Sequence, residues 1–192
     1  MLVLASTSVY RRELLARLRL PFDTARPDLD ETPLAGEAPD AMVRRLSLGK
    51  ARAVARQRPG DWVIGSDQAA ELDGRPLGKP GDRANAVGQL MSMSGRDVRF
   101  LTGISLLCRH GDGETLHEAM DITTVRFRPL QRDEVERYVD AETPYDCAGS
   151  FKCEGLGIAL FDAIETCDPT ALVGLPLIAT ARLLRAAGHA LP

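Results

Sequence analysis

Residues 1–18 read MLVLASTSVYRRELLARL, an apolar run followed by small hydroxylated residues and then an amphipathic segment. The run Leu2–Leu4 predicts a short buried strand, and the leucines that follow at helical spacing predict a helix packed by one face. Ser6 and Ser8 lie between the two, where a side-chain oxygen can accept from free N–H groups of the first helical turn. Because those N–H groups and the positive end of the helix dipole face the same place, this stretch predicts an anion site.

Arg11 and Arg12 fall in the first turn of the predicted helix, where acidic residues are usual. Two cations there oppose the helix dipole by roughly 0.3–1 kcal/mol each. Two interpretations remain open. The arginines either extend into solvent or hold a polyanion bound at the helix start. Residues that oppose a local structural preference without stabilising the local structure are typical of a functional site.

The composition bounds what the chain can be. Its 192 residues make one domain, or one domain with a lobe, and allow a sizeable core. A net charge of −3 argues against bulk nucleic-acid binding, so any cationic cluster must act locally. The four cysteines show no CxxC pair, which argues against a zinc site and favours a reduced, cytoplasmic protein with small buried thiols. No signal peptide or membrane span is predicted.

An acidic segment follows a probable strand at Leu20–Thr24. Three acids lie within four residues between Pro27 and Pro33, and the prolines keep this segment extended. Asp30 and Glu31 are therefore predicted on a loop, where carboxylates can hold magnesium together with substrate phosphates. A solvated acidic loop is the alternative.

Lys50 breaks the pattern of the next helix, which is predicted from Pro39 to about Arg56. On a helical wheel it falls in the middle of the apolar stripe, where lysines are rare. Such a lysine either extends its amine past the packed face to water or points at an anion. With two arginines predicted at the first helix, we favour the anion.

A second carboxylate is predicted beside these cations. Trp62–Gly65 reads as a buried strand, and Asp67 follows it, where ligands bind in α/β proteins. Leu72–Arg75 then predicts a hairpin turn that brings back Lys79. The sequence around Lys79 is too short for a P-loop.

The remaining chain alternates helices with strands and then adds a hairpin. This predicts a three-layer α/β domain with a mixed sheet. The segments, in chain order, are a helix between Asp82 and Gly95, strands at Val98–Leu107 and Leu116–Phe127, a helix at Gln131–Asp140, a loop at Cys147–Gly157, a strand at Ile158–Phe161 and a last helix to about Ala187.

The four cations and three carboxylates suit a triphosphate bound with a divalent metal. Such a site can catalyse attack at phosphorus by positioning and electrostatic stabilisation, with little covalent work. No Ser–His–Asp arrangement is visible. The residues themselves therefore point to an enzyme acting on a small phosphate ligand. The cations are Arg11, Arg12, Lys50 and Lys79, and the carboxylates are Asp30, Glu31 and Asp67.

Eight fragments go further, because they occur in a fixed order over most of the chain: ASTSVYRRELL, DLDETP, SLGKA, VIGSDQ, LGKP, SGRDVRFLTG, CAGSFKCEGLG and DPTALVGLPL. This set closely resembles the Maf family of nucleotide pyrophosphatases. The resemblance implies an elongated α/β fold related to the inosine triphosphate pyrophosphatases, here one domain over residues 1–192 with two lobes around a central cleft. It also implies cleavage of a nucleoside triphosphate between its α and β phosphates, with Mg²⁺, Mn²⁺ or Co²⁺.

The resemblance assigns roles residue by residue. Asp67, Glu31 and Lys79 become catalytic, with Asp67 as proton acceptor and with Glu31 and Asp67 as metal ligands. Substrate binding is assigned to Ser6, Tyr10, Arg11, Arg12, Lys50, Gln68 and Glu154. A homodimer in the cytoplasm is also expected.

Tyr10, Gln68 and Glu154 stand at the three positions where branches of the family differ, and they match the YceF-type branch associated with 7-methyl-GTP. The chemistry agrees, since methylation at N7 makes guanine cationic, and both an aromatic face and a carboxylate favour a cation. From the residues alone, Tyr10 could instead pack in the core, Gln68 could satisfy backbone groups, and Glu154 could be a solvated loop acid. This branch often has tryptophan at the position of Tyr10, and the family usually has proline at the position of Val9.

Two other functions fit the same residues. One is the same reaction on dTTP, UTP or a deaminated purine triphosphate. The other is a nucleotide-binding regulator of cell division that needs no turnover. In either case the expected partner is a small nucleotide, with no bulk nucleic acid and no membrane.

Overall fold

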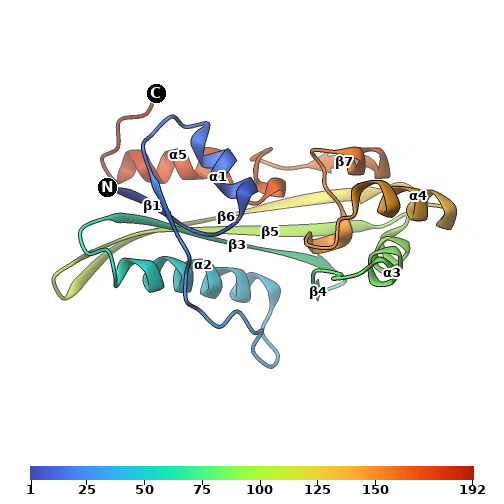
Figure 1. Ribbon diagram of the computed structural model, residues 1–192, viewed down its shortest axis with the longest axis horizontal. Helices are drawn as coiled ribbons and strands as arrows, with labels where there is room; N and C mark the ends of the chain where they lie inside the picture. Colours follow the sequence, from blue (N-terminus) through green and yellow to red (C-terminus); the bar gives the residue numbers. More distant parts are fainter.

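A mixed sheet of seven strands runs the length of the computed structural model, which describes residues 1–192 (Figure 1). The strand order is β2-β1-β3-β5-β6-β7, and β4 pairs with the far end of β3. The strands are β1 (Leu2–Ala5), β2 (Asp23–Ala25), β3 (Trp62–Leu72), β4 (Arg75–Leu77), β5 (Asp97–His110), β6 (Gly113–Phe127) and β7 (Phe161–Glu165).

Only the edge near the N-terminus is parallel. Strand β1 pairs in parallel with β2 and β3, whereas β3, β5, β6 and β7 pair antiparallel with their neighbours. The α/β class with a mixed sheet, predicted from the sequence, is confirmed.

Helices cover both faces of one half of the sheet. Figure 1 shows α2 beneath the sheet and α1 with α5 above it, while α3 and α4 gather at the far end. The predicted three layers and elongated shape are therefore present. The helices are α1 (Val9–Ala16), α2 (Pro39–Ala55), α3 (Arg83–Met93), α4 (Arg132–Glu142) and α5 (Leu177–Ala186), with 3₁₀ turns η1 (Ala148–Ser150), η2 (Leu156–Leu160) and η3 (Ala171–Val173).

The buried apolar side chains divide in the same way as the layers. One cluster joins β1, α1 and α5 on the upper face, and two smaller ones join α2 to the sheet. A larger cluster of 17 buried residues fills the far end, where α3 and α4 pack on the ends of the long strands. The sheet thus connects two packed regions, and the candidate site lies between them.

Two glycines bring α2 close to the sheet. A Cβ at Gly65 would overlap the backbone carbonyl of Ser47, and one at Gly103 would lie 2.7 Å from a methyl group of Val43. Gly103 stands opposite Asp67 in the ladder between β3 and β5. The missing side chains therefore let α2 approach Asp67 closely, which is what allows Lys50 to reach it.

Two strand predictions are wrong in their bounds. The predicted strand at Trp62–Gly65 continues to Leu72, because β5 pairs with it from Trp62 to Glu71. Asp67 therefore lies within β3 and not after it. It nevertheless lies beyond the end of β1, whose pairing with β3 stops at Ile64.

The predicted strand at Ile158–Phe161 is wrong as well. Residues 156–160 form a 3₁₀ turn, and β7 begins at Phe161. A Cβ at Gly157 would overlap the backbone carbonyl oxygen of Lys152, so the chain turns tightly before it extends. The strand predicted at Leu20–Thr24 is confined to three residues, Asp23–Ala25.

Candidate active site

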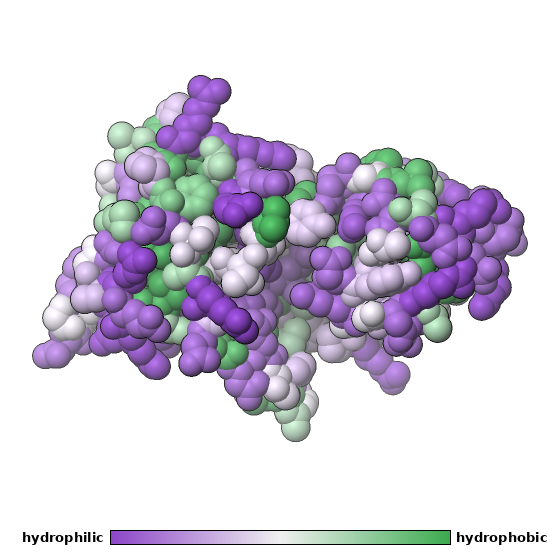
Figure 2. Space-filling view, viewed as in Figure 1, coloured by the Kyte–Doolittle hydropathy of each residue, from purple (hydrophilic) through white to green (hydrophobic).

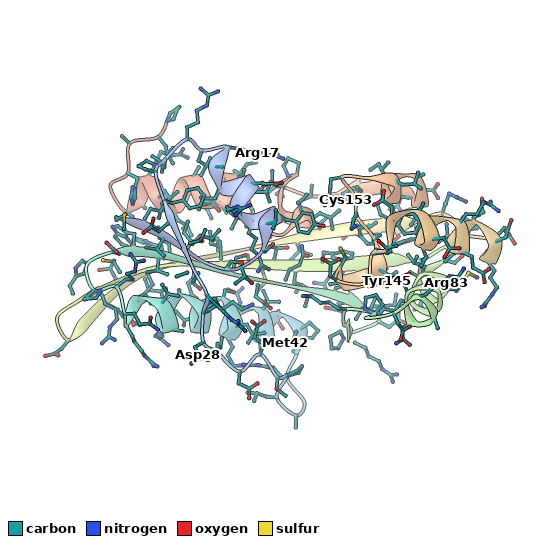
Figure 3. The ribbon with its side chains drawn as sticks, in the orientation of Figure 1. Arg17, Asp28, Met42, Arg83, Tyr145 and Cys153 are labelled. Carbon is teal, nitrogen blue, oxygen red and sulfur yellow. The ribbon has the colours of Figure 1, made fainter.

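Two adjoining cavities lie between the two packed regions, where the molecule is hollowed in Figure 2. The first, of about 580 Å³, has 12 hydrophobic residues among 25 in its lining, and we call it the apolar cavity. The second, of about 1010 Å³, has 4 among 16, and we call it the polar cavity. Met42 of α2 and Cys153 of the far end, both labelled in Figure 3, reach the apolar cavity from different elements. The residues common to both cavities are Ser8, Tyr10, Arg11, Glu31, Lys50, Lys79 and Asp146.

The turn after β1 forms part of the wall of the polar cavity. Ser8 is the N-cap of α1, and its Oγ accepts from the backbone N–H of Arg11 at 3.4 Å. The hydroxyl oxygen of Ser6 accepts from the N–H of Ser8 at 3.1 Å, so Ser6 shapes the turn and does not cap the helix itself. Both serines line the polar cavity, as the anion site predicted from residues 1–18 requires.

Lys50 is buried at the centre of the site. Its Nζ donates to Oδ1 of Asp67 at 2.7 Å and to Oε2 of Glu31 at 2.8 Å. The side chains of Lys50 and Asp67 are 6% and 10% exposed, whereas Glu31 is 54% exposed. Lys50 therefore joins the loop carboxylate to the strand carboxylate, and its contact with a bound anion, as favoured from the sequence, stays a prediction.

Arg11 and Arg12 have different surroundings. Arg11 is half-buried, lines both cavities, and donates from Nε to the carbonyl oxygen of Gly174 at 2.9 Å. Burial lowers the pKa of the Arg11 guanidinium, and the charges of Asp67 and Glu31 act in the opposite direction. Arg12 is exposed, lines neither cavity and makes no side-chain hydrogen bond or ion pair. The structure thus brings only one of the two arginines to the site.

Lys79 reaches the site through the predicted hairpin. Strands β3 and β4 pair through a turn at Asp73 and Gly74, and Lys79 follows β4. Its side chain is exposed, lines both cavities and makes no ion pair. Its ammonium group is therefore free to meet an anion.

The amide nitrogen of Gln68 is occupied by hydrogen bonds within the protein and is not available to a ligand. The Nε2 group donates to the carbonyl oxygens of Ala171 and Leu172 at 2.9 and 3.1 Å, and it lies 3.0 Å from Oγ1 of Thr102. These bonds hold η3 against the sheet. The alternative interpretation from the sequence, that Gln68 satisfies backbone groups, is thus confirmed. Only the amide oxygen of Gln68 has no hydrogen-bond partner in the chain.

Tyr10 and Glu154 share the apolar cavity. Tyr10 is half-buried, and desolvation raises the pKa of its hydroxyl, with further increases from the charges of Asp146 and Glu154. Tyr10 is therefore a neutral ring at physiological pH. Glu154 is exposed, and its Oε2 accepts from the thiol of Cys153 at 3.4 Å.

The cysteines are less uniform than the sequence suggested. Cys108 is buried, Cys147 and Cys153 are half-buried in the wall of the apolar cavity, and Cys167 is exposed. Burial raises the pKa of both cavity thiols to about 12, so they stay protonated and act as apolar lining. All four are free, and the expectation of small buried thiols is wrong for Cys167.

Sequence reasoning missed the residues that hold the segment 168–176. The hydroxyl of Ser66 donates to the carbonyl oxygen of Gly174 at 3.1 Å, beside the bond from Arg11. Asp168 is buried and its Oδ2 accepts from the N–H of Ile178 at 2.6 Å, so it caps α5 from outside the helix. The N-cap residue Pro176 makes no side-chain bond, and this absence is the one local signal that a distant cap is needed.

The donor set for a metal is incomplete within the protein. No three His, Cys, Asp or Glu side chains come together closely enough to hold an ion. Asp67 and Glu31 each have one oxygen that accepts from Lys50 and one that accepts no hydrogen bond. Mg²⁺ is commonly bound by one or two carboxylates together with water and substrate phosphates, and these two carboxylates fit that mode.

Comparisons with known proteins find relatives over nearly the full length of the chain. A family model described as "Maf-like protein" matches residues 1–187. A protein of Xanthomonas oryzae pv. oryzae (strain MAFF 311018) named "7-methyl-GTP pyrophosphatase" is 64% identical, over 100% of this chain and 98% of its own length. A protein of the same name from Albidiferax ferrireducens is 57% identical, over 97% of this chain and 93% of its own.

The solved structure of a HAM1 protein from Coxiella burnetii has a similar fold. It covers 98% of each chain with a TM-score of 0.55 and 16% sequence identity. At that identity the likeness concerns the fold alone. No helix of this chain has the length and apolar character needed to cross a membrane.

Proposed function

Because the chain belongs to the Maf family, we propose that it hydrolyses 7-methyl-GTP between the α and β phosphates, giving 7-methyl-GMP and pyrophosphate. The observation that carries the proposal is the junction of two unlike cavities at Lys50 and Glu31, where Lys50 also bonds Asp67 of the apolar cavity. One cavity is polar and is lined by four cationic and four acidic side chains, and the other is apolar and contains the ring of Tyr10 and the carboxylate of Glu154. The names of the full-length relatives support the choice of base. The reaction would remove a modified nucleotide.

The polar cavity suits the triphosphate. Arg11, Lys50 and Lys79 supply positive charge, and the first turn of α1 supplies free N–H groups beside Ser6. Because these groups meet phosphate, neutralising any one of them should slow turnover of every nucleotide tested. Arg12 lies outside both cavities, and its part in binding stays a prediction.

Asp67 is suited to accept a proton from the attacking water. Lys50 holds Oδ1 at 2.7 Å and so fixes the carboxylate, while Oδ2 accepts no hydrogen bond. An oxygen that is positioned but unused can remove a proton as water attacks phosphorus. Lys79, whose ammonium has no partner, can stabilise the charge that develops on the phosphates.

Glu31 and Asp67 are the residues that would hold a divalent cation, with the phosphates completing its ligands. When bound, Mg²⁺, Mn²⁺ or Co²⁺ would neutralise phosphate charge and orient the groups for in-line attack. The incomplete donor set supports binding of the ion together with the nucleotide and not before it. Metal affinity without nucleotide should therefore be weak.

The apolar cavity suits the base. The ring of Tyr10 and the charge of Glu154 both favour a cationic 7-methylguanine over neutral guanine, the ring by roughly 0.5–2 kcal/mol. Gln68 can contribute one acceptor oxygen there, since its nitrogen is occupied by η3. We therefore assign base selectivity mainly to Tyr10 and Glu154.

A panel of triphosphates tests the proposal. The protein is incubated with 7-methyl-GTP, GTP, UTP, dTTP or ITP and with each of the three metals, and the products are separated by chromatography. We expect 7-methyl-GMP and pyrophosphate in equal amounts, without orthophosphate. A preference for UTP or dTTP, or release of orthophosphate, would contradict it. The free cysteines suit the reducing cytoplasm, which we propose as the compartment, and the homodimer stays a prediction.

A further inference from the structure

Arg26 lies beside the anion site, although none of the sequence motifs includes it. Strands β1 and β2 are parallel and in register, with Ala5 opposite Ala25. Ser6 and Arg26 are the next residues of the two strands, so both leave the sheet at the same carboxyl edge. Ligands of α/β proteins bind outside this edge. Arg26 lines the polar cavity together with Ser6, as the register requires.

The guanidinium of Arg26 has no partner in the chain. It is exposed and takes part in no salt bridge and no side-chain hydrogen bond. The acids Glu13, Asp28 and Asp146 line the same cavity, yet none of them bonds to it. Pro27 follows directly and favours an extended backbone at Arg26, which limits the directions that the side chain can take.

The other cations of the polar cavity divide into two kinds. Lys50 is neutralised by two carboxylates, and Arg11 gives its Nε to Gly174. Lys79 and Arg26 alone have no protein partner. A triphosphate carries more negative charge than one free lysine can balance, and an arginine can bind two phosphate oxygens at once.

We propose that Arg26 binds the terminal phosphates of the substrate, the part that leaves as pyrophosphate. The proposal rests on the proposed function for the nucleotide, but its anion is common to all triphosphates. Arg26 then does in the cavity what the sequence assigned to Arg12. It acts as a substrate-binding residue and not as a group that moves protons.

Binding of inorganic pyrophosphate tests the proposal without reference to any base. Calorimetry with Mg²⁺ compares the wild type with Arg26→Ala, Arg26→Lys and the control Arg182→Ala, an exposed arginine of α5 outside both cavities. Losing a charge-assisted contact should weaken pyrophosphate binding about tenfold in Arg26→Ala. Arg26→Lys should be intermediate, and Arg182→Ala should stay within twofold of the wild type.

Product inhibition supplies the second measurement. In Arg26→Ala, inhibition by pyrophosphate should weaken about tenfold, while inhibition by 7-methyl-GMP stays within about twofold. Equal behaviour of Arg26→Ala and Arg182→Ala would overturn the proposal, as would equal weakening of both products. Failure of the wild type to hydrolyse 7-methyl-GTP would overturn the proposed function, and the pyrophosphate titration would still decide the role of Arg26. Since the exposed Arg26 side chain makes no hydrogen bond or salt bridge in the fold, its loss should leave the melting temperature nearly unchanged.

Discussion

Replacing Lys50 by methionine should separate stability from catalysis at the centre of the site. Methionine keeps an unbranched stem in the apolar stripe of α2 and removes only the ammonium group. Asp67, 10% exposed, then loses the donor 2.7 Å away and keeps its charge. Glu31, 54% exposed, returns to solvent at little cost.

The expected loss of unfolding free energy follows from this difference in exposure between Asp67 and Glu31. Removing one partner of a buried pair costs about 3–5 kcal/mol. Because Asp67 borders a water-accessible cavity, we expect the lower end, about 3 kcal/mol of unfolding free energy. For a chain of this length that corresponds to a melting temperature roughly 6–12 °C lower. Turnover of all nucleotides should be lost, since Asp67 is no longer held.

A double variant tests whether the unpaired charge of Asp67 causes the loss of stability. In Lys50→Met with Asp67→Asn, no unpaired buried charge remains, and stability should recover by at least about 1 kcal/mol. Activity should not recover. Urea unfolding followed by the fluorescence of Trp62, the only tryptophan, gives the free energies. A single variant as stable as the wild type, or a double variant less stable than the single one, would refute the reasoning.

Three further predictions concern the site and the fold. Asp67→Asn should lower kcat about 10²-fold or more with a smaller loss of unfolding free energy than Lys50→Met, because Glu31 still pairs with Lys50, and unchanged turnover in steady-state kinetics would remove Asp67 as proton acceptor. Glu154→Gln should reduce the preference for 7-methyl-GTP over GTP about tenfold, since a charged hydrogen bond exceeds a neutral one by roughly 1 kcal/mol. Tyr10→Ala should reduce that preference too, whereas Tyr10→Trp should keep or raise it, and equal ratios in all variants would remove both residues from the base site. The hydrogen bond from Arg45 lowers the pKa of Glu37 from 4.5 to about 2. This pair therefore stabilises the fold above pH 4.5, and the stabilisation is lost as the pH falls toward 2. The melting-temperature difference between wild type and Glu37→Gln should therefore vanish over that interval, and a constant difference would contradict the assignment.

The sequence predicted well where a local pattern coincides with a tertiary contact. Residues 1–18 gave strand, turn and capped helix because each signal lies within a few residues of the next. Helical periodicity placed Lys50 on the packed face of α2, and on that face its amine bonds the carboxylate of Asp67. The hairpin that carries Lys79 follows from a turn with Asp73 and Gly74.

The failures come from contacts between distant segments. The length of β3 is set by β5, which pairs with it over ten residues and has no trace in the local sequence. Gln68 is committed to η3, about a hundred positions later, so its amide could not be foreseen as occupied. That Arg26 lines the polar cavity and Arg12 does not could not be foreseen for the same reason, because the register of β1 with β2 is what places Arg26 beside Ser6.

The ratio of kcat/KM for 7-methyl-GTP to that for GTP, measured on the wild-type protein with Mg²⁺, tests the central claim most directly. The two nucleotides share the same phosphates and differ only in the charge and methyl group of the base. A ring and a carboxylate in the apolar cavity predict a ratio of about ten or more in favour of the methylated nucleotide. A ratio near one, or faster turnover of UTP or dTTP, would contradict the account and leave only a general pyrophosphatase.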